Sequence, residues 1–305
     1  MKGRGATVKA FALTIFALTA LSASAAIIKD VRDAITQNDF KHGAELIQTY
    51  RAANGVTPEM LEALSWMARG SLGAKNLDQA ERYSEETYQL SVAQLKKRPM
   101  DQEAHLPIAI GAVMEVEANV LALRGQRTEA ITYLQDQLKT YYSTSIRTRI
   151  QKNINLLTME GKPAPTLEKV SLPKGKPVLI FFWAHWCGDC KAEGPILAKL
   201  KTEFGPRGLE IVAPTQKYGY VANGVEATPD VELPYIDQIR RERYADIITT
   251  PAPVSEENFR KYGASTTPTL VLVDRSGIVR LYHPGRMTYE ELRPLVEKLV
   301  QPSAS

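Results

Sequence analysis

The sequence predicts two consecutive folds, an all-α half made of helical hairpins and an α/β half with a central mixed sheet flanked by helices. From about residue 27 to 157, apolar residues recur at helical spacing with few strand-like runs. In the second half, short apolar runs alternate with helical patterns, which is typical of a sheet covered by helices. Between the halves, Pro163 and Pro165 impose an extended path. We therefore expect domains over residues 26–160 and 161–302.

The first 25 residues have the pattern of a secretory signal peptide. Three basic residues precede an apolar run from Ala10 to Leu21, and an A-x-A cleavage pattern ends at Ala25. The run is 12 residues long, shorter than the ~20 residues that a transmembrane helix needs, and we expect no later stretch to qualify. The protein is therefore expected to be exported, to the periplasm or cell envelope. An uncleaved membrane anchor is the alternative.

The composition excludes one large class of function. With 44% hydrophobic and 24% charged residues, the chain can bury ordinary cores. Part of its net charge of +4 comes from the three basic residues of the first segment. No run of Lys and Arg, and no stripe of basic and aromatic residues, indicates contact with nucleic acid. We expect no nucleic-acid partner.

Three segments of the helical half resemble one another. They cover residues 37–46, 75–83 and 125–134. Each places a short polar turn before a helix that carries a small residue, Ala44, Ala80 or Ala130, where helices can approach closely. The pattern resembles tetratricopeptide helix pairs, but the alanines are 36 and then 50 residues apart, so the repeats are degenerate. Stacked helix pairs form concave surfaces, and we expect this half to bind a protein partner.

Seven elements are expected in the α/β half. The strands are placed at residues 178–183, 209–213, 269–274 and 278–283, and the helices at 191–204, around 234–245, and at 289–300. Gly277 turns the third strand back into the fourth, which predicts an antiparallel hairpin. The first two strands are joined through a helix, which predicts a parallel pair. The sheet is therefore mixed.

The two cysteines of the chain stand close together, where the first strand gives way to its helix. Cys187 and Cys190 form a C-x-x-C pair at the first helical turn. There, free backbone N–H groups and the positive end of the helix dipole stabilise a thiolate, and such cysteines have pKa values of ~3.5–7.5 instead of ~8.5. The thiolate is the nucleophile of disulfide exchange. The pair indicates a redox-active dithiol.

Two other interpretations of the pair are weaker. A structural zinc site needs four ligands. The histidines that would have to complete it are scattered along the chain at His42, His105, His185 and His283. A purely structural disulfide across two intervening residues closes too short a loop to restrict the unfolded chain much.

Six segments of the second half, the dithiol among them, together carry a resemblance to a known family. They are Pro163–Pro165, Phe182–Cys190, Pro195, Thr267–Thr269, Val273–Gly277 and Pro284–Gly285. With them, residues from about 161 to 300 resemble the thioredoxin superfamily, and within it the exported TlpA-like and ResA-like thiol-disulfide oxidoreductases. The resemblance implies a thioredoxin fold for this half and does not extend to the helical half.

The resemblance also implies roles for residues outside the dithiol. Thr267 and Pro268 correspond to a cis-proline loop that faces the dithiol, where the Thr267 backbone would pair with an extended substrate. Trp186 corresponds to a substrate-surface residue. Glu193, one helical turn after Cys190, corresponds to an acidic residue linked to proton handling. An ordinary solvated glutamate is the alternative for Glu193.

Three positions depart from the family pattern or stay open. Phe181 stands where thioredoxin has a buried aspartate, which leaves Glu193 as the local carboxylate. Gly188 and Asp189 separate the cysteines where a proline is common, and the charge of Asp189 suits a helix start but repels a nearby thiolate. His185 is expected to be an exposed, incidental histidine, with tuning of the thiol as the alternative.

These observations predict an exported thiol-disulfide oxidoreductase, and the resemblance favours reduction of protein disulfides. No metal and no organic cofactor are expected. The expected partners are protein thiol or disulfide substrates and a membrane or periplasmic electron donor. Two alternatives stay open: a partner-binding scaffold with a secondary or vestigial redox domain, and a peroxide-reducing thiol enzyme.

Overall fold

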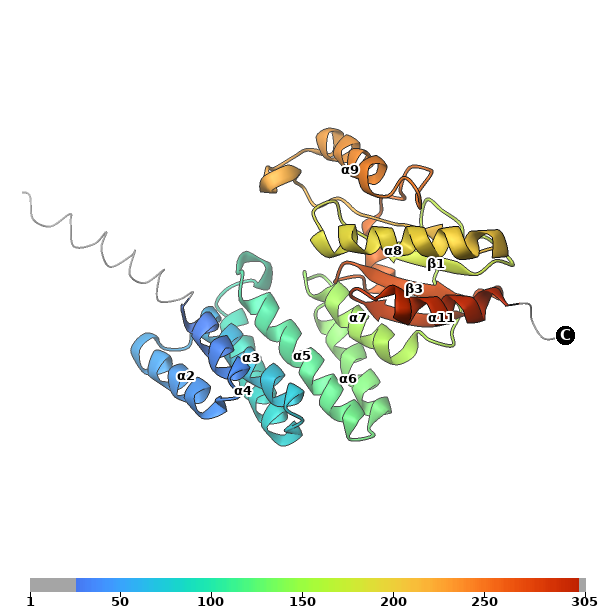
Figure 1. Ribbon diagram of the computed structural model, residues 1–305. Coiled ribbons are helices and arrows are strands. Elements are labelled where there is room, and N and C mark those ends of the chain that lie inside the picture. Colours follow the sequence, from blue (N-terminus) through green and yellow to red (C-terminus); the bar gives the residue numbers. More distant parts are fainter. Residues whose placement is uncertain (1–25, 302–305) are drawn as a thin grey trace, which may run out of the picture. The chain divides into compact units, whose positions relative to one another are not determined.

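The computed structural model describes residues 26–301, and by its internal contacts the chain divides into two compact units between Ile146 and Arg147 (Figure 1). Each unit is described here by itself. The predicted signal peptide at residues 1–25 lies outside the described residues, as does the predicted end of the second domain at residue 302.

Every regular element among the described residues of the first unit is a helix. Residues 26–36 are helical. The elements that follow are α2 (Phe40–Asn54), α3 (Pro58–Gly73), α4 (Leu77–Leu95), the short 3-10 helix η1 (Met100–Gln102), α5 (Leu106–Leu123) and α6 (Arg127–Thr140). The side chains of Asp39, Thr57 and Asn76 each accept a backbone N–H at a helix start, which explains where α2, α3 and α4 begin. The all-α prediction is confirmed, and the likeness to tetratricopeptide repeats stays a prediction.

The α5 helix is the most apolar element of this unit. Its 18 residues have a mean hydropathy of 1.6, so by length and composition it is a candidate membrane span. The expectation that no stretch after the first 25 residues qualifies is therefore wrong. The helix contacts α3, α4 and α6, and Ala109, Ile110 and Val113 are buried among them. Its apolar character is accounted for by the core of the helical unit.

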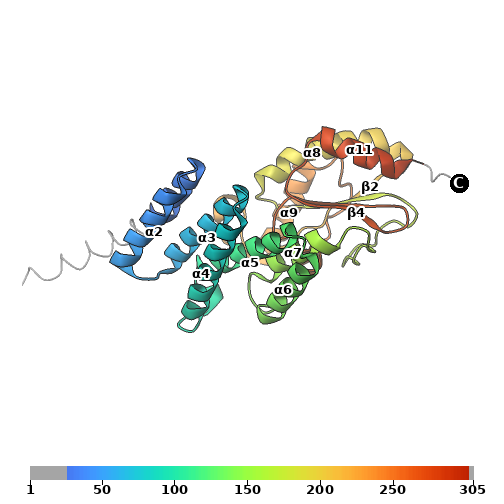
Figure 2. The ribbon, with the colours of Figure 1, turned by 90° about the horizontal axis from the view of Figure 1, so that it is seen from below.

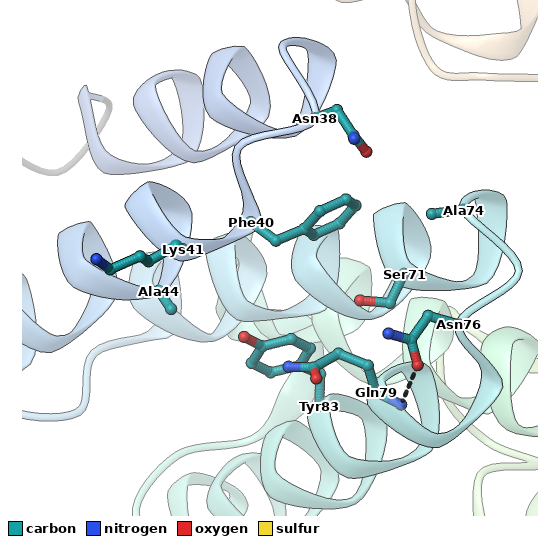
Figure 3. A pocket seen from close by; sticks show the side chains of 9 residues that line it. All are labelled: Asn38, Phe40, Lys41, Ala44, Ser71, Ala74, Asn76, Gln79 and Tyr83. Atoms are coloured by element: carbon teal, nitrogen blue, oxygen red, sulfur yellow. Dashed lines mark hydrogen bonds between the residues drawn. The ribbon is translucent and has the colours of Figure 1, made fainter.

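A cavity of about 540 Å³ opens between α2, α3 and α4 (Figure 3). Its lining is both polar and apolar and consists of Asn38, Phe40, Lys41, Ala44, Ser71, Ala74, Asn76, Gln79 and Tyr83. The Ser71 hydroxyl is buried and has no hydrogen-bond partner among the described residues. The Oδ1 atom of Asn76 accepts the backbone N–H of Gln79, which fixes the start of α4 at one wall of the cavity.

The second unit contains a four-stranded sheet and its covering helices. Its elements are α7 (Arg147–Thr158), β1 (Val178–Phe182), α8 (Gly188–Phe204), η2 (Gly205–Arg207), β2 (Glu210–Val212), η3 (Ala222–Gly224), α9 (Pro229–Arg243), α10 (Glu256–Tyr262), β3 (Thr269–Val273), β4 (Val279–Pro284) and α11 (Tyr289–Val300). The strand order is β2-β1-β3-β4. β1 pairs with β2 in parallel, and β3 is antiparallel to both β1 and β4. The predicted mixed sheet of the thioredoxin fold is confirmed.

The central strand β1 is buried along its whole length because both faces of the sheet are covered. Leu179 and Phe181 pack into one core with α8 and α11, which Figure 2 shows over one face of the sheet. Val178, Ile180 and Phe182 pack into a second core with α10. The side chains alternate as the pleat of a strand requires, and this explains why β1 reads as a continuous apolar run.

The α7 helix belongs to the second unit by its contacts. Its Asn155 side-chain amide donates to the Lys261 carbonyl of α10 over 3.4 Å. Gly263, at φ +60°, lies so close to the α7 backbone that a Cβ would stand 2.4 Å from the Lys152 nitrogen. The sequence-based prediction places α7 in the helical half because its apolar residues recur at helical spacing. A boundary near residue 160 stays a prediction about independent folding.

Two α-helices between β2 and β3 differ from the sequence-based expectation. The α9 helix begins at Pro229, several residues before the expected start, with Asp230 and Glu232 in its first turn. The α10 helix was not expected. It has seven residues, too few for a periodic pattern, and begins at the side-chain cap Ser255.

Candidate dithiol site

The end of β1 and the start of α8 place the two cysteines. Cys187 is the N-cap residue of α8, and its Sγ atom accepts the backbone N–H of Cys190 over 3.0 Å. The two Sγ atoms form a disulfide, with an S–S distance of 2.25 Å. In the reduced state, the same N–H and the helix dipole stabilise a thiolate on Cys187.

The dithiol is buried apart from its immediate rim. Cys187 is 3% exposed and Cys190 is 0% exposed, so the first cysteine is only slightly the more open. Gly188 and Asp189 are exposed, and Trp186 is 48% exposed. The exposed residues that adjoin the pair therefore lie at the start of α8 and directly before Cys187. Among residues 26–301, no group of three or more His, Cys, Asp or Glu side chains is arranged to hold a metal ion.

The loop before β3 lies against the dithiol. Its Thr267–Pro268 peptide bond is cis, and the Thr267 carbonyl oxygen is 3.4 Å from the Cys187 Sγ. In the disulfide, the Cys187 sulfur has no proton to donate to this oxygen. In the reduced state, a Cys187 thiol would donate to it. The Pro268 carbonyl accepts the Gly285 N–H over 2.8 Å, which ties the loop to the end of β4. The structure thus brings Thr267 to Cys187 and has a cis bond at Thr267–Pro268.

Glu193 is buried one turn after Cys190, and it is not a solvated helix residue. Its Oε2 atom accepts the Met287 N–H over 3.4 Å and lies 3.8 Å from Nε of Arg286. Its Oε1 atom has no hydrogen-bond partner among the described residues. Burial, only partly offset by the Met287 and Arg286 contacts, raises the pKa of Glu193 to about 7.

The position of the buried aspartate of thioredoxin is apolar here. Phe181 packs against the ring of Tyr244, with centroids 5.6 Å apart, and Trp183 packs against the same ring at 5.0 Å. The Trp183 Nε1–H donates to the Ala213 carbonyl over 3.1 Å. No carboxylate enters the site at residue 181, and Glu193 is the buried carboxylate that α8 contributes.

His185 is buried, so the expectation of an exposed histidine is wrong. It is 1% exposed, and its Nε2 atom lies 3.3 Å from Oε1 of Glu232, itself 1% exposed. Burial, which outweighs the hydrogen bond to Glu232, lowers the pKa of His185. Sequence analysis missed Glu232, because it lies on α9, far along the chain from the dithiol motif. Its place in the first turn of α9 is the only sequence signal that marks it.

The comparisons with known proteins concern the second unit. The family model described as a thioredoxin-like domain matches residues 165–299. The thioredoxin-like protein YneN of Bacillus subtilis is 30% identical over 143 residues, which are 44% of this chain and 76% of that protein. The thiol-disulfide oxidoreductase ResA of Bacillus cereus is 27% identical over 165 residues, which are 52% of this chain and 83% of that protein.

Among solved structures, a thiol:disulfide interchange protein from Chlorobium tepidum is similar to 46% of this chain and 97% of its own, at 21% identity and a TM-score of 0.36. The sequence relatives carry the assignment, because they span most of their own length. Together with the mixed sheet and the dithiol at the start of α8, they show that the chain belongs to the thioredoxin-like family of thiol-disulfide oxidoreductases.

Proposed function

We propose that the protein is an exported enzyme that reduces protein disulfides through Cys187 and Cys190. The observation that carries the proposal is the N-cap position of Cys187, whose Sγ accepts the Cys190 N–H over 3.0 Å. An N–H directed at this atom favours the nucleophilic thiolate over the thiol. The family supplies the class of reaction, thiol-disulfide exchange.

In the first step, the Cys187 thiolate attacks one sulfur of the substrate disulfide. A bond forms between Cys187 and that sulfur, the substrate S–S bond breaks, and the leaving substrate thiolate takes up a proton. Cys187 is assigned as the attacking residue because it faces Thr267 and adjoins the exposed Trp186, whereas Cys190 is 0% exposed. The difference in exposure between the cysteines is small, so their surroundings carry the assignment.

In the second step, Cys190 loses its proton and attacks the Cys187 sulfur of the mixed disulfide. The Cys187–Cys190 bond forms, and the second substrate thiolate leaves. Two electrons have then passed from the dithiol to the substrate. The enzyme ends as the disulfide, the form with an S–S distance of 2.25 Å.

Glu193 is proposed as the acceptor of the Cys190 proton. It lies one turn after Cys190 on α8, is buried, and has an oxygen without a partner among the described residues. A pKa of about 7 is suited to this role, since proton transfer is most effective when the pKa of the base is near the working pH.

The substrate is proposed to lie along Thr267, Pro268 and Trp186. The backbone of Thr267 is 3.4 Å from the Cys187 sulfur through its carbonyl oxygen, so a strand-like substrate segment paired with it would bring its cystine to Cys187. Trp186 offers an exposed aromatic surface directly before Cys187. Both features support an extended polypeptide as the substrate.

The direction of the reaction and the location of the protein are also part of the proposal. The signal-like pattern at residues 1–25 supports export, to the periplasm or cell envelope. The resemblance of the second half to the TlpA-like and ResA-like oxidoreductases favours reduction. Each turnover leaves a disulfide, so a membrane or periplasmic electron donor has to restore the dithiol.

The helical unit is proposed to bind a protein partner, and the cavity between α2, α3 and α4 supports this role (Figure 3). A fragment of residues 161–305 would then reduce insulin but lose activity toward the native partner. Because α7 packs on α10, a fragment of residues 147–305 is the matched control. If only the longer fragment folds, the division lies at residue 147 and not near residue 160.

The main proposal is tested by turnover of insulin disulfides with dithiothreitol as the electron donor. The protein without residues 1–25 should reduce insulin, and the Cys187→Ser variant should not. A midpoint potential near the −270 mV of thioredoxin supports reduction, whereas one near −120 mV indicates an oxidant. Absence of turnover by the unaltered protein would favour a scaffold, and turnover of hydrogen peroxide alone would favour a peroxide-reducing enzyme.

A further inference from the structure

Glu232 forms a second buried carboxylate site beside the dithiol motif, one that the proposed exchange reaction does not use. It lies in the first turn of α9 and is 1% exposed. Its Oε1 atom accepts the Tyr218 N–H over 2.5 Å and its Oε2 atom accepts the Gly219 N–H over 3.0 Å. The His185 Nε2 atom lies 3.3 Å from Oε1. Three donors from two other segments therefore meet on one side chain.

The direction of the hydrogen bond defines the state of His185. A carboxylate oxygen only accepts, so Nε2 carries the proton and donates to Glu232. The Nδ1 atom has no hydrogen-bond partner among the described residues, and burial lowers the pKa of the ring. A neutral histidine with its proton on Nε2 satisfies both observations. Glu232 thus fastens α9 to the turn at residues 218–219 and to the residue two before Cys187.

This arrangement extends to the exposed rim through the ring of Tyr218. Its centroid is 5.5 Å from that of His185 and 5.5 Å from that of Trp186, with edge-to-face geometry in both cases. Tyr220 and Tyr235 also pack edge-on against His185, at 5.5 and 5.4 Å. The main chain of Tyr218 is held by Glu232 while its ring supports the Trp186 ring.

We propose that Glu232 and His185 are positioning residues that hold Tyr218 and Trp186 as an aromatic wall beside Cys187. The wall makes the enzyme prefer disulfides carried on apolar polypeptide segments over small hydrophilic disulfides. This proposal rests on the proposed function of the dithiol. An apolar side chain next to the substrate cystine buries area against Trp186, which a small hydrophilic disulfide cannot do.

The test compares Glu232→Gln with the control Glu242→Gln on the same helix. Glu242 is exposed, and its carboxylate accepts a hydrogen bond from the Gln238 side chain. For each, kcat and KM are measured with insulin and with bis(2-hydroxyethyl) disulfide. In Glu232→Gln, the ratio of kcat/KM for insulin to kcat/KM for the small disulfide should fall about ten-fold or more, through KM for insulin. Glu242→Gln should leave the ratio within about two-fold of the unaltered enzyme.

A second variant decides the question if Glu232→Gln does not fold. Tyr218→Ala removes the ring but keeps the main-chain N–H bond to Glu232, and it should lower the same ratio. Acrylamide quenching of tryptophan fluorescence should increase in both variants, since Trp186 loses its support. The proposed wall would be contradicted by an unchanged kcat/KM ratio in the folded variants. It would also be contradicted if Glu242→Gln lowered the ratio as much as Glu232→Gln. Loss of both activities in the unaltered protein would instead defeat the proposed function, and quenching would still report on the wall.

Discussion

Glu193 and Glu232 are both buried glutamates near the dithiol, but their surroundings differ sharply. Glu232 has both oxygens engaged, by two backbone N–H groups and by His185. Glu193 has one long hydrogen bond from Met287 and a distant Arg286, and its Oε1 atom has no partner. The Glu232 carboxylate therefore has hydrogen-bond donors on both oxygens, whereas the Glu193 carboxylate does not.

The difference shows that two buried glutamates near one site can have different roles, depending on the hydrogen-bond donors around them. A buried carboxylate without enough donors is costly in its charged form, so its pKa rises, here to about 7 for Glu193. Such a group exchanges a proton near neutral pH. A buried carboxylate with donors on both oxygens holds the segments that supply them. We therefore expect changes at Glu193 to alter chemistry and changes at Glu232 to alter recognition.

The largest expected effect concerns the dithiol that both carboxylates adjoin. Cys187→Ser should abolish turnover, and Cys190→Ser should accumulate a mixed disulfide with the substrate, because the resolving thiol is missing. Non-reducing electrophoresis after incubation with insulin measures the trapped species. Trapping by Cys187→Ser in place of Cys190→Ser would reverse the assigned roles, and Glu193 would then lie one turn after the attacking cysteine.

The next effect separates the two carboxylates by rate. Glu193→Gln should slow exchange by ~10²-fold, since general base assistance is lost. In the unaltered enzyme the rate should rise as pH increases through about 7, because Glu193 accepts a proton only when ionised. That limb should be missing in Glu193→Gln and present in Glu232→Gln. Stopped-flow exchange between pH 5 and 9 measures it, and a persisting limb in Glu193→Gln assigns the proton to another group.

Stability should change with opposite signs in the same two variants. The pKa of Glu193 is raised in the fold from 4.5 to about 7, so the folded protein holds a proton that the unfolded chain has lost. Stability contributed by this group is present below pH 4.5 and is lost as pH rises through about 7. Glu193→Gln should therefore be more stable than the unaltered protein at pH 8, by on the order of 1–3 kcal/mol.

Glu232→Gln should be less stable by ~1–3 kcal/mol at both pH 5 and pH 8, because a buried N–H loses its acceptor. Urea unfolding of the oxidised proteins at the two pH values measures both effects. A loss of stability at pH 8 in Glu193→Gln would mean that its contacts with Met287 and Arg286 outweigh the cost of its buried charge.

The sequence predicts the parts of the site that lie within one stretch of chain or within the family motifs. The C-x-x-C pair, the strand before it and the helix after it follow from apolar periodicity and spacing. The closeness of Thr267 and Pro268 to Cys187 follows from the resemblance, which implies that the loop before β3 faces the dithiol. In the structure the Thr267 carbonyl oxygen lies 3.4 Å from the Cys187 sulfur.

The sequence does not predict the surroundings of His185. Its burial depends on Glu232 and on tyrosines between residues 218 and 235, in the long connection between β2 and β3. Periodicity gives the approximate place of a helix there but not the side of the sheet on which that helix lies. The sequence around His185 therefore does not show that these residues cover its ring. The burial of Glu193 escapes the sequence for a related reason, because its cover comes from Arg286 and Met287 after β4.

The smallest expected effects come from the charges around Glu193. Asp189 raises the pKa of Glu193, whereas Arg286, 3.8 Å away, lowers it. Asp189→Asn should therefore move the midpoint of the rate profile to lower pH, and Arg286→Gln should move it to higher pH. Both side chains are substantially exposed, so solvent and salt screen them, and each shift should be below about one pH unit and shrink in 0.5 M salt. Shifts of the same sign in both variants would show that Glu193 is not the group that sets the profile. If the two variants shift the midpoint in opposite directions, and still do so when combined with Glu232→Gln, then Glu193 and not Glu232 is the group that exchanges the proton.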